Sequence, residues 1–257
     1  YSLHIYCTMT ETLFVGKNSF KFDELSSTND WLMEQIFLQK LSEGTIVIAG
    51  NQTKGKGQRG SSWSAQDSRS LTFSVLLKPD FLLITHAFDL SVCVALAIHD
   101  CLNELRPGFH IKWPNDIYFE NKKIAGVLIE NQLSRSAYQN AVVGIGLNVN
   151  QMDFEDLPHA ISLKKIVGVE FPVEKVMERL CETLEARYLQ LRAGKFEALK
   201  KAYLSELYWF NETHFYKYQN ELLQGKIIDV LRNGCLQVEL IDGKIRDFDI
   251  KEIEFVE

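Results

Sequence analysis

The stretch from His110 to Asn150 constrains the fold more than any other, because four strand-like runs follow one another with only short connections. The runs read HIKW, DIYFE, KIAGVLIENQL and YQNAVVGIGLNVN, and β-branched residues alternate along them. Asn121 and Lys122 stand between the second and third runs, as expected for a tight turn. Since strands joined by such short connections pair antiparallel, we predict an antiparallel meander here.

Amphipathic helices are predicted on both sides of this meander. From Ser27 the sequence STNDWLMEQIFLQKLSEG begins with a capping residue and carries apolar residues at helical spacing, and we expect Gly44 to close the helix. A longer helix, rich in Ala, Leu and Val, is predicted from about Leu83 to Leu105, before Pro107. The chain is therefore predicted to mix helices with a sheet.

The remaining segments follow the same logic. Short strands are predicted at 45–49 and 71–78, and residues 172–206 return to helix, with Gly194 separating two amphipathic pieces. After Asn211 the pattern changes to short alternating strands broken by turn residues, which predicts a small β-barrel. The predicted breaks are Gly225, Asn233-Gly234 and Asp242-Gly243.

We thus expect an α+β fold with a mixed, mainly antiparallel sheet flanked by helices. The first domain would span 1–211, and the barrel, over 212–257, would pack directly on it because no low-complexity linker separates them.

Composition limits the function classes. The 257 residues carry 28 Lys and Arg against 34 Asp and Glu, a formal charge of −6, which argues against a dedicated nucleic-acid binder. Five cysteines without a C-x-x-C pair make structural zinc and a disulfide framework unlikely and favour a reducing compartment, so no protein metal site is predicted. Cys93 and Cys101 are read as buried thiols. We find no apolar run of membrane-spanning length and expect a cytoplasmic protein without membrane contact.

The glycine-rich stretch GNQTKGKGQRGSSW, from Gly50 to Trp63, fits the opening of the phosphate-binding pattern G-x-x-x-x-G-K-[ST]. That reading fails, because Gly57 stands where a Ser or Thr hydroxyl would bind Mg²⁺ and QRGSSW is a poor helix start. The remaining interpretation is a mobile basic loop that closes over an anion, and the alternative is a solvated surface loop. Its glycines and its basic residues are Gly55, Gly57, Gly60, Lys54, Lys56 and Arg59.

A second stretch, KWPND, has a more specific shape. Pro114 forces an extended or turning backbone and places Asn115 and Asp116 where one strand stops and another begins. Side chains at such a junction project into a cleft. Trp113 could stack there on a purine, although a tryptophan taken alone is more often part of the core.

Two further positions are notable. Lys123 begins an otherwise apolar strand, and Gly126 leaves space beside it; an edge lysine is the alternative. In VVGIGLNVN, Gly144 and Gly146 lack the third glycine and the helix of a dinucleotide fingerprint, so that reading is rejected. Glycines in a strand instead indicate close approach of backbone or ligand, and Asn148 could hydrogen-bond a base.

Taken in order, five motifs resemble the signature of biotin protein ligases, over roughly residues 20–150. They are S-S-T-N (26–29), Q-T-K-G-K-G-Q-R-G-x-x-W (52–63), K-W-P-N-D (112–116), K-K-I-A-G (122–126) and G-I-G-L-N-V (144–149). The terminal barrel also resembles that family's small C-terminal domain. The resemblance implies a catalytic fold like that of class II aminoacyl-tRNA synthetases.

The resemblance further implies two steps: biotin and ATP form biotinyl-5′-AMP and pyrophosphate, and a lysine of a biotin carboxyl carrier protein domain then takes the biotinyl group. Its carrier would belong to a biotin-dependent carboxylase. By similarity, the biotin-binding residues are Ser27, Thr28, Asn29, Gln52, Gly55, Lys56, Gly57, Gln58, Lys123 and Gly126. The nucleotide-binding residues are Lys56, Arg59, Trp63, Trp113, Asn115, Lys123 and Asn148.

The chemistry of the two steps suggests the catalytic roles. The first step joins two anions, and Lys56, Arg59 and Lys123, with Mg²⁺, would neutralise their charge without a protein nucleophile. The second needs a neutral amine, but a lysine of pKa about 10.4 is neutral in only about one molecule in a few thousand at pH 7. Asp116 is our candidate to orient that lysine and accept its proton. The predicted catalytic residues are therefore Lys123, Asp116 and Arg59.

Two departures accompany the resemblance. Many relatives carry arginines where this loop has Lys56 and Gln58, and neither side chain reproduces the planar fork of arginine. Only 26 residues precede Ser27, too few for the helix-turn-helix domain of some members, so we expect no DNA binding.

Two rival functions and the oligomeric state stay open. A lipoate- or octanoate-transferring enzyme would share the catalytic fold, and a sensor would bind biotin or nucleotide without transfer. K-W-P-N-D, the basic loop and the terminal barrel favour the biotin ligase. Strand edges near 130–150 leave a homodimer open.

Overall fold

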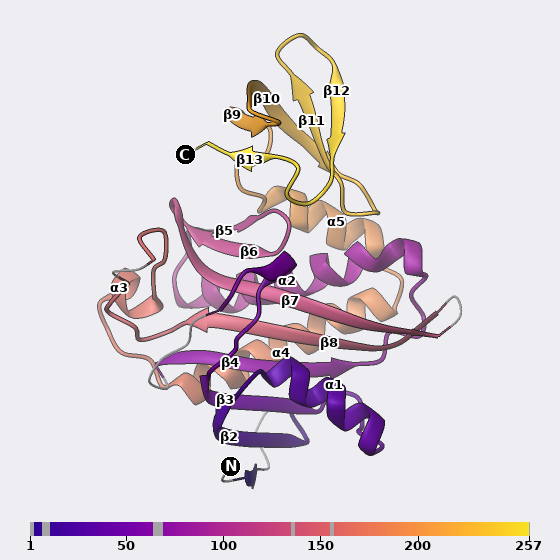
Figure 1. Ribbon diagram of the computed structural model, residues 1–257, viewed down its shortest axis with the longest axis vertical. Coiled ribbons are helices and arrows are strands. Elements are labelled where there is room, and N and C mark those ends of the chain that lie inside the picture. Colours follow the sequence, from indigo (N-terminus) through magenta and orange to yellow (C-terminus); the bar gives the residue numbers. More distant parts are fainter. Residues whose placement is uncertain (1–2, 7–10, 64–68, 135–136, 155–156, 257) are drawn as a thin grey trace.

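Two sheets organise the chain (Figure 1). The computed structural model describes residues 3–6, 11–63, 69–134, 137–154 and 157–256. The larger sheet has eight strands in the order β1-β2-β3-β4-β8-β7-β6-β5. They are β1 (Leu3–Tyr6), β2 (Ser19–Leu25), β3 (Ile46–Gln52), β4 (Ser70–Leu77), β5 (Phe109–Lys112), β6 (Asp116–Phe119), β7 (Lys122–Ser134) and β8 (Ala137–Asn148).

The predicted meander is confirmed, because β5, β6, β7 and β8 pair antiparallel in sequence order. β4 joins β8 antiparallel, and β2 pairs with β3 in parallel, so the sheet is mixed and mainly antiparallel, as expected. The register places Asp116 opposite Gly126 and Gly126 opposite Gly146, in one row across three strands. On the next strand, Thr72 stands opposite Gly146.

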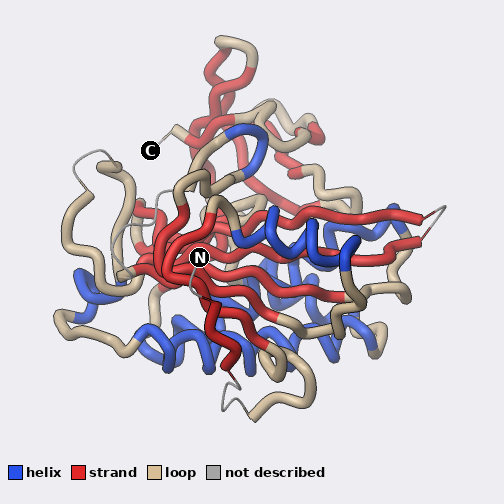
Figure 2. The backbone as a smooth tube through the Cα atoms, turned by 60° about the horizontal axis from the view of Figure 1, so that its bottom comes forward, coloured by secondary structure: helices blue, strands red, loops and turns tan. Residues whose placement is uncertain are grey.

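Helices cover both faces of this sheet (Figure 2). The α-helices are α1 (Thr28–Leu38), α2 (Ala87–Leu105), α3 (Leu163–Val167), α4 (Val173–Arg192) and α5 (Phe196–Ser205), and two 3₁₀ turns are η1 (Gln58–Gly60) and η2 (Ile84–His86). Alternate residues of the strands face opposite sides. Val47 and Val142 pack with Leu32 of α1, whereas Ile46 and Val143 belong to the larger core that contains α2 and α4.

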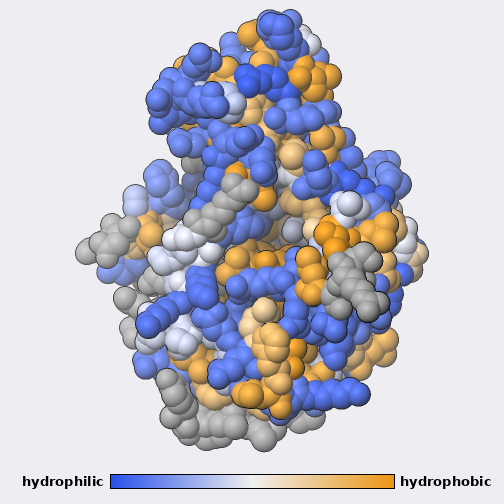
Figure 3. Space-filling view, turned by 45° about the vertical axis from the view of Figure 1, so that its right-hand side comes forward, coloured by the Kyte–Doolittle hydropathy of each residue, from blue (hydrophilic) through white to orange (hydrophobic). Residues whose placement is uncertain are grey.

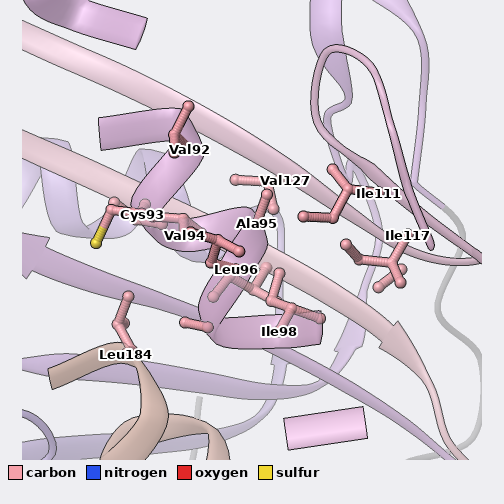
Figure 4. Packing of buried hydrophobic residues seen from close by; sticks show 14 of the residues in the cluster. Val92, Cys93, Val94, Ala95, Leu96, Ile98, Ile111, Ile117, Val127 and Leu184 are labelled. Carbon is pink, nitrogen blue, oxygen red and sulfur yellow. The ribbon is translucent and has the colours of Figure 1, made fainter. Parts of the chain in front are cut away.

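The main core forms around α2. Figure 4 shows side chains of this helix from Val92 to Ile98 among Ile111 of β5, Ile117 of β6 and Val127 of β7, with Leu184 of α4 nearby. Complete burial of this many branched side chains is the dominant stabilising contribution, at about 1.5–3 kcal/mol for each. This core therefore fixes the positions of the strands that form the meander.

The apolar length of α2 corrects one sequence prediction. Within the described residues, the 22-residue stretch Ile84–Leu105 is long and apolar enough to cross a membrane, so the statement that no run reaches that length is wrong. Its apolar character has a simpler cause here, because 61% of its apolar 18-residue segment is buried inside the protein. A helix packed between a sheet and a second helix needs apolar residues on more than one face.

The predicted α1 begins as expected but ends early. Ser27 is its N-cap, and its hydroxyl accepts a hydrogen bond from the backbone N–H of Asp30 at 3.3 Å. The helix stops at Leu38, and Gly44 does not close it. Gly44 lies in the turn before β3 with φ of 80°, where a Cβ would lie 2.3 Å from the carbonyl oxygen of Phe14. A glycine is therefore needed at this position because two backbone segments approach each other closely, and not because a helix ends there.

The second sheet occupies the C-terminal part of the chain. Its five antiparallel strands, in the order β12-β11-β10-β9-β13, are β9 (Thr213–Tyr218), β10 (Glu221–Val230), β11 (Leu236–Leu240), β12 (Ile245–Phe248) and β13 (Glu254–Phe255). Gly225 does not break a strand as predicted, because β10 runs through it. A Cβ there would lie 2.7 Å from Val238 Cγ1 and 2.8 Å from the carbonyl oxygen of Glu239, so close packing explains the glycine.

The small sheet packs directly on the larger unit. The indole Nε1 of Trp113 donates a hydrogen bond to the carbonyl of Gly234, which lies between β10 and β11, at 2.9 Å. Figure 3 shows this part of the chain as a narrower lobe above the wider body, with the surface hollowed where the two meet. The placement of a domain boundary between residues 211 and 212 stays a prediction.

Candidate active site

A cleft of about 390 Å³ lies on the α1 side of the large sheet, beneath the small sheet. It collects residues from the start of α1, the glycine-rich loop, the β5–β6 turn and strands β4, β7 and β8. The predicted site residues that line it are Ser27, Thr28, Asn29, Gln52, Lys56, Gly57, Gln58, Trp63, Trp113, Asn115, Asp116, Lys123 and Gly126. One concave surface thus joins four of the five motifs and also Gly144 and Gly146 of the fifth.

The first residues of α1 form the most buried polar wall of the cleft. The backbone N–H of Thr28 donates a hydrogen bond to Gln52 Oε1 at 2.7 Å, and the Thr28 hydroxyl oxygen lies 3.0 Å from the same atom. Asn29 donates through Nδ2 to Glu130 Oε2 at 2.7 Å. Both residues are almost fully buried, so their orientation is set by these partners rather than by solvent.

The glycine-rich loop folds back on itself beside this wall. The backbone N–H of Gly57 bonds to the carbonyl of Ser61 at 2.7 Å, and that of Trp63 bonds to the carbonyl of Gly55 at 3.0 Å. Lys56 lies at its exposed edge and donates to Asp30 Oδ1 at 2.5 Å. That hydrogen bond and the charge of Asp30, opposed by partial burial, raise the pKa of Lys56. The loop thus presents a cation at the mouth of the cleft.

The opposite wall holds an ion pair. Lys123 Nζ lies 2.7 Å from Asp116 Oδ1, and both side chains are partly exposed to the cleft. Burial raises the pKa of the Asp116 carboxyl, although the charges of Lys123 and Lys112 oppose the shift. A carboxylate with a raised pKa is a better proton acceptor than a free one. Gly126 makes room for the pair, because a Cβ there would lie 2.9 Å from Lys123 Nζ.

Trp63 closes the cleft above β8. A Cβ at Gly146 would lie 2.2 Å from Cε2 of the indole, so a side chain at that position would displace the ring. Lys123 Nζ is 5.8 Å from the ring centroid, within range of a cation–π contact. The buried Nε1 of Trp63 has no hydrogen-bond partner among the described residues, which leaves an N–H donor for a bound group.

The KWPND turn lies between the two sheets. Its Trp113–Pro114 peptide bond is cis. Trp113 is buried, yet it lines the cleft, so the core and cleft interpretations of this residue both hold. Asn115 donates through Nδ2 to the carbonyl of Val127. That bond fixes the turn against β7 and leaves the remaining amide oxygen of Asn115 for a ligand.

Two predicted site residues are placed away from the cleft surface, and a third is not described in full. Asn148 does not line the cleft; it is buried and donates through Nδ2 to the carbonyl of Ile161 at 3.1 Å. Gly55 lies behind the cleft surface, where a Cβ would lie 2.2 Å from the carbonyl oxygen of Trp63. The backbone of Arg59 lies in η1, but its side chain is outside the described part of the structure.

Several cleft residues were missed by the sequence analysis. Thr72 lines the cleft from β4, and its hydroxyl has no partner among the described residues. Ser74 of the same strand lies behind the cleft surface, in contact with Thr28 and Asn29. The C-terminal segment also contributes Ile250, Lys251, Ile253 and Phe255. Lys251 Nζ donates to the carbonyl of Gln58 at 3.0 Å, which ties the small sheet to the loop. Alternation could have indicated the β4 hydroxyls, whereas no local signal indicated a contact across 193 residues.

Thiols and metal ligands supply no separate centre in the described residues. Cys93, Cys101, Cys181 and Cys235 are free, and burial raises the pKa of both Cys101 and Cys181 to about 12, which makes them poor nucleophiles. This confirms the interpretation of Cys93 and Cys101 as buried thiols; Cys7 lies outside the described residues. No group of three or more His, Cys, Asp or Glu in the described ranges is arranged to hold a metal ion.

Comparisons with known proteins agree with this geometry. A model described as the biotin/lipoate A/B protein ligase family matches residues 21–148. The bifunctional ligase/repressor BirA of Bacillus subtilis is 30% identical over 249 residues, which cover 94% of this chain and 76% of that protein. The biotin–[acetyl-CoA-carboxylase] ligase of Mycobacterium tuberculosis is 32% identical over 174 residues, covering 66% of this chain and 63% of the relative.

A solved structure extends the match to three dimensions. The biotin protein ligase of Aquifex aeolicus, in complex with biotin and ATP, has a TM-score of 0.78 at 29% identity and covers 93% of this chain and 98% of its own. The similarity therefore includes the small C-terminal sheet as well as the cleft. Sequence, fold and cleft together show that the chain belongs to the biotin/lipoate A/B protein ligase family, among its biotin protein ligases.

Proposed function

We propose that this chain is an ATP-dependent biotin protein ligase. It forms biotinyl-5′-AMP and pyrophosphate from biotin and ATP and then transfers the biotinyl group to a lysine of a biotin carboxyl carrier protein domain. The observation that carries the proposal is one cleft in which the Lys123–Asp116 pair faces the polar wall of Thr28, Asn29 and Gln52. An ammonium ion opposite a neutral polar pocket suits a ligand with a polar ring at one end and a carboxylate at the other.

In the first step, the biotin carboxylate attacks the α-phosphorus of ATP, and the bond to pyrophosphate breaks. Lys123 lies in the cleft to bind the carboxylate or a phosphate oxygen, and Lys56 supplies positive charge at its mouth. Fixed cations lower the repulsion between two anions and align them, so no covalent enzyme intermediate is needed. Arg59 is assigned to the same task from its place in the loop.

Mg²⁺ accompanies ATP in this proposal. Within the described part of the chain, Asp116 is the acidic residue that lines the cleft. Magnesium keeps several waters and is held by one or two carboxylates together with substrate phosphates, so one nearby carboxylate fits a cation that arrives on the nucleotide. When bound, it would neutralise phosphate charge.

In the second step, the carrier lysine must lose a proton before it attacks the acyl carbon. Asp116 is assigned as the acceptor of that proton, because it lies in the cleft and its pKa is raised. The Lys123 ammonium beside it can move to the leaving phosphate as charge develops there. AMP then departs with the bonding electrons of the acyl–phosphate bond.

The nucleotide would bind between the tryptophans. Trp63 offers an unpartnered N–H and an aromatic face, and Trp113 and Asn115 line the same end of the cleft. Stacking of a purine on an aromatic side chain suits such a surface. Asn148, whose amide is engaged with Ile161, is assigned to this end as support for the wall rather than as a direct contact.

A lipoate ligase is the competing function, because the family model covers both substrates. The biotin–[acetyl-CoA-carboxylase] ligase of Mycobacterium tuberculosis and the biotin protein ligase of Aquifex aeolicus both match this chain, which favours biotin. The test is pyrophosphate release from ATP and Mg²⁺ with biotin or lipoate, with and without a carrier domain. Release with biotin alone, followed by carrier labelling, is expected; release with lipoate alone would assign the rival function, and release without labelling would indicate a sensor.

Location and partners complete the proposal. A formal charge of −6 and four free described cysteines suit a protein of the reducing cytoplasm with no nucleic-acid partner. Residues 141–147 of β8 are not an edge, because they pair with both β4 and β7. We therefore propose a homodimer through the side of β7 that β6 leaves uncovered beyond Gly126, and sedimentation at two protein concentrations tests it.

A further inference from the structure

We propose that Ser74 and Glu130 are positioning residues for the ligand-binding wall of the cleft, acting through Asn29 and Thr28. They fix the direction in which hydrogen bonds run through this wall and so make Thr28 and Gln52 hydrogen-bond acceptors toward the ligand. The inference rests on the proposed function only in naming biotin as that ligand. Neither residue lines the cleft surface itself, and both act from behind it.

Four side-chain oxygens form a continuous chain in this wall. Gln52 Oε1 lies 3.0 Å from Thr28 Oγ1, which lies 2.7 Å from Ser74 Oγ. Ser74 Oγ in turn lies 2.6 Å from Asn29 Oδ1. Each distance is that of a hydrogen bond, and each bond needs one hydrogen between its two oxygens.

The chain has fewer hydrogens than contacts. Its two ends are amide oxygens, which only accept, and the two hydroxyls between them carry one hydrogen each. Three contacts therefore share two hydrogens, from Thr28 and Ser74. Ser74 is completely buried, so water cannot supply the third. One of the three contacts must lack a hydrogen.

Rotation of the Asn29 amide would supply a third hydrogen to the chain, but Glu130 prevents this rotation. Asn29 Nδ2 donates to Glu130 Oε2 at 2.7 Å, and a turned amide would place its oxygen against a carboxylate that has no hydrogen to give. The Asn29 amide also packs closely over Gly144, where a Cβ would lie 2.4 Å from Asn29 Oδ1. The Gln52 amide is fixed in the same way by the backbone N–H of Thr28.

The contact that lacks a hydrogen is the one at the cleft, between Thr28 and Gln52. The contact from Ser74 to Asn29 is the shortest, and that from Thr28 to Gln52 the longest. With Ser74 donating to Asn29 and Thr28 donating to Ser74, the two oxygens of Thr28 and Gln52 face each other with no hydrogen between them. Both residues line the cleft, so a ligand N–H placed between them completes the chain. A ligand with a cyclic urea or amide N–H is selected over one with an oxygen at that place.

Two substitutions test this assignment through opposite ends of the network. In Glu130→Gln, the new carboxamide can donate to Asn29 Oδ1, so the Asn29 amide can turn and donate to Ser74. The chain then has three hydrogens for three contacts, and the acceptor pair is lost. In Ser74→Ala, the Thr28 hydroxyl keeps only Gln52 as an acceptor, with the same result.

For both variants we expect the KM for biotin to rise about tenfold or more, as for loss of a buried hydrogen bond. The kcat and the KM for ATP should stay within about twofold. Calorimetric titration with biotin alone should show the same loss of affinity. Glu24→Gln is the matched control, because Glu24 accepts a hydrogen bond from Asn51 Nδ2 at 3.0 Å on the exposed surface.

The outcomes separate this inference from the proposed function. A wild-type protein that releases no pyrophosphate with biotin would refute the function. A wild type that is active, with variants whose KM for biotin is unchanged, would refute the roles of Ser74 and Glu130 alone. A lower kcat, a higher KM for both substrates and a lower Tm would also refute these roles, since together they are the effects of a merely structural role. If one variant fails to fold, the other variant decides.

Discussion

The ammonium of Lys123 and the carboxylate of Asp116 lie 2.7 Å apart across two neighbouring strands, over a position that holds glycine. The pair neutralises itself while the cleft is empty of substrate. Entry of an anion gives Lys123 a second partner and frees Asp116 to act on the incoming amine. One ion pair can therefore serve both steps of the proposed reaction in turn.

Asp116→Asn should slow transfer to the carrier by at least about a hundredfold, because the amide cannot accept the proton of the attacking lysine. Formation of biotinyl-5′-AMP should change much less. Single-turnover transfer from preformed biotinyl-5′-AMP and separate pyrophosphate release measure the two steps. Asp242→Asn, at an exposed carboxylate of the small sheet, is the control, and equal losses in both steps would contradict the assignment.

The pH dependence of transfer should report the same carboxyl. Burial raises the pKa of Asp116, so this group becomes protonated at a higher pH than the ordinary value of about 3.9. Transfer needs the ionised form; its rate should therefore fall as the pH drops through the raised pKa and reach a plateau above it. The acid limb should be absent in Asp116→Asn. A limb that persists in this variant would assign it to another group.

Gly126→Ala should impair adenylate formation about tenfold or more with little loss of stability. The added methyl would lie 2.9 Å from Nζ and 3.0 Å from Cε of Lys123, and a flexible side chain moves aside more easily than backbone. Displacement of Lys123 separates it from Asp116 and from the substrate carboxylate. Pyrophosphate release measures the first effect and thermal unfolding the second; a large fall in Tm with normal kinetics would contradict the prediction.

The glycine-rich loop should become protected from trypsin when biotin and ATP are added together. Cleavage at Lys54, Lys56 and Arg59 reports its opening, and unchanged cleavage would count against closure over the acyl-adenylate. Lys251→Met should raise the cleavage rate of the ligand-free protein, because it removes the bond to the carbonyl of Gln58. Lys244→Met, in the same sheet, is the control and should leave cleavage unchanged.

Glu185→Ala should lower the free energy of unfolding by about 3 kcal/mol. The buried carboxylate accepts hydrogen bonds from the backbone N–H groups of Leu13, Phe14 and Val15 at 2.5, 2.7 and 3.0 Å, and its removal leaves those donors unsatisfied. Urea denaturation measures the change. Glu182→Ala, which breaks a partly exposed pair with Arg179, should cost less than about 1 kcal/mol. Similar losses in both variants would contradict the role of burial.

Local patterns predicted the elements whose structure is decided locally. The meander from β5 to β8 follows from alternation and turns, and the Ser27 cap follows from its own helix. The five motifs also located most of the cleft, since they lie at the ends of predicted elements. Gly44 and Gly225 were misread because a sequence shows that a position is glycine but not which neighbour requires it.

Long-range contacts account for what the sequence could not show. Ser74 is an ordinary strand residue until α1 is placed against β4, and Glu130 gains its role only from the position of Asn29. The approach of Lys251 to Gln58 depends on how the two sheets pack. The length of α2 was ambiguous for the same reason, because only packing tells a core helix from a membrane span.

The row formed by Asp116, Gly126 and Gly146 makes the chemistry depend on strand alignment. Side chains alternate along a strand, so a slip of β7 by one residue would turn Lys123 away from Asp116 and turn the core residue Val127 toward the cleft. Such a slip would remove the site and disturb the core together, because β7 carries residues of both. The pairing of β7 with β8 beyond the register shift between Gln132 and Leu133 lies further along the strands and takes no part in this row.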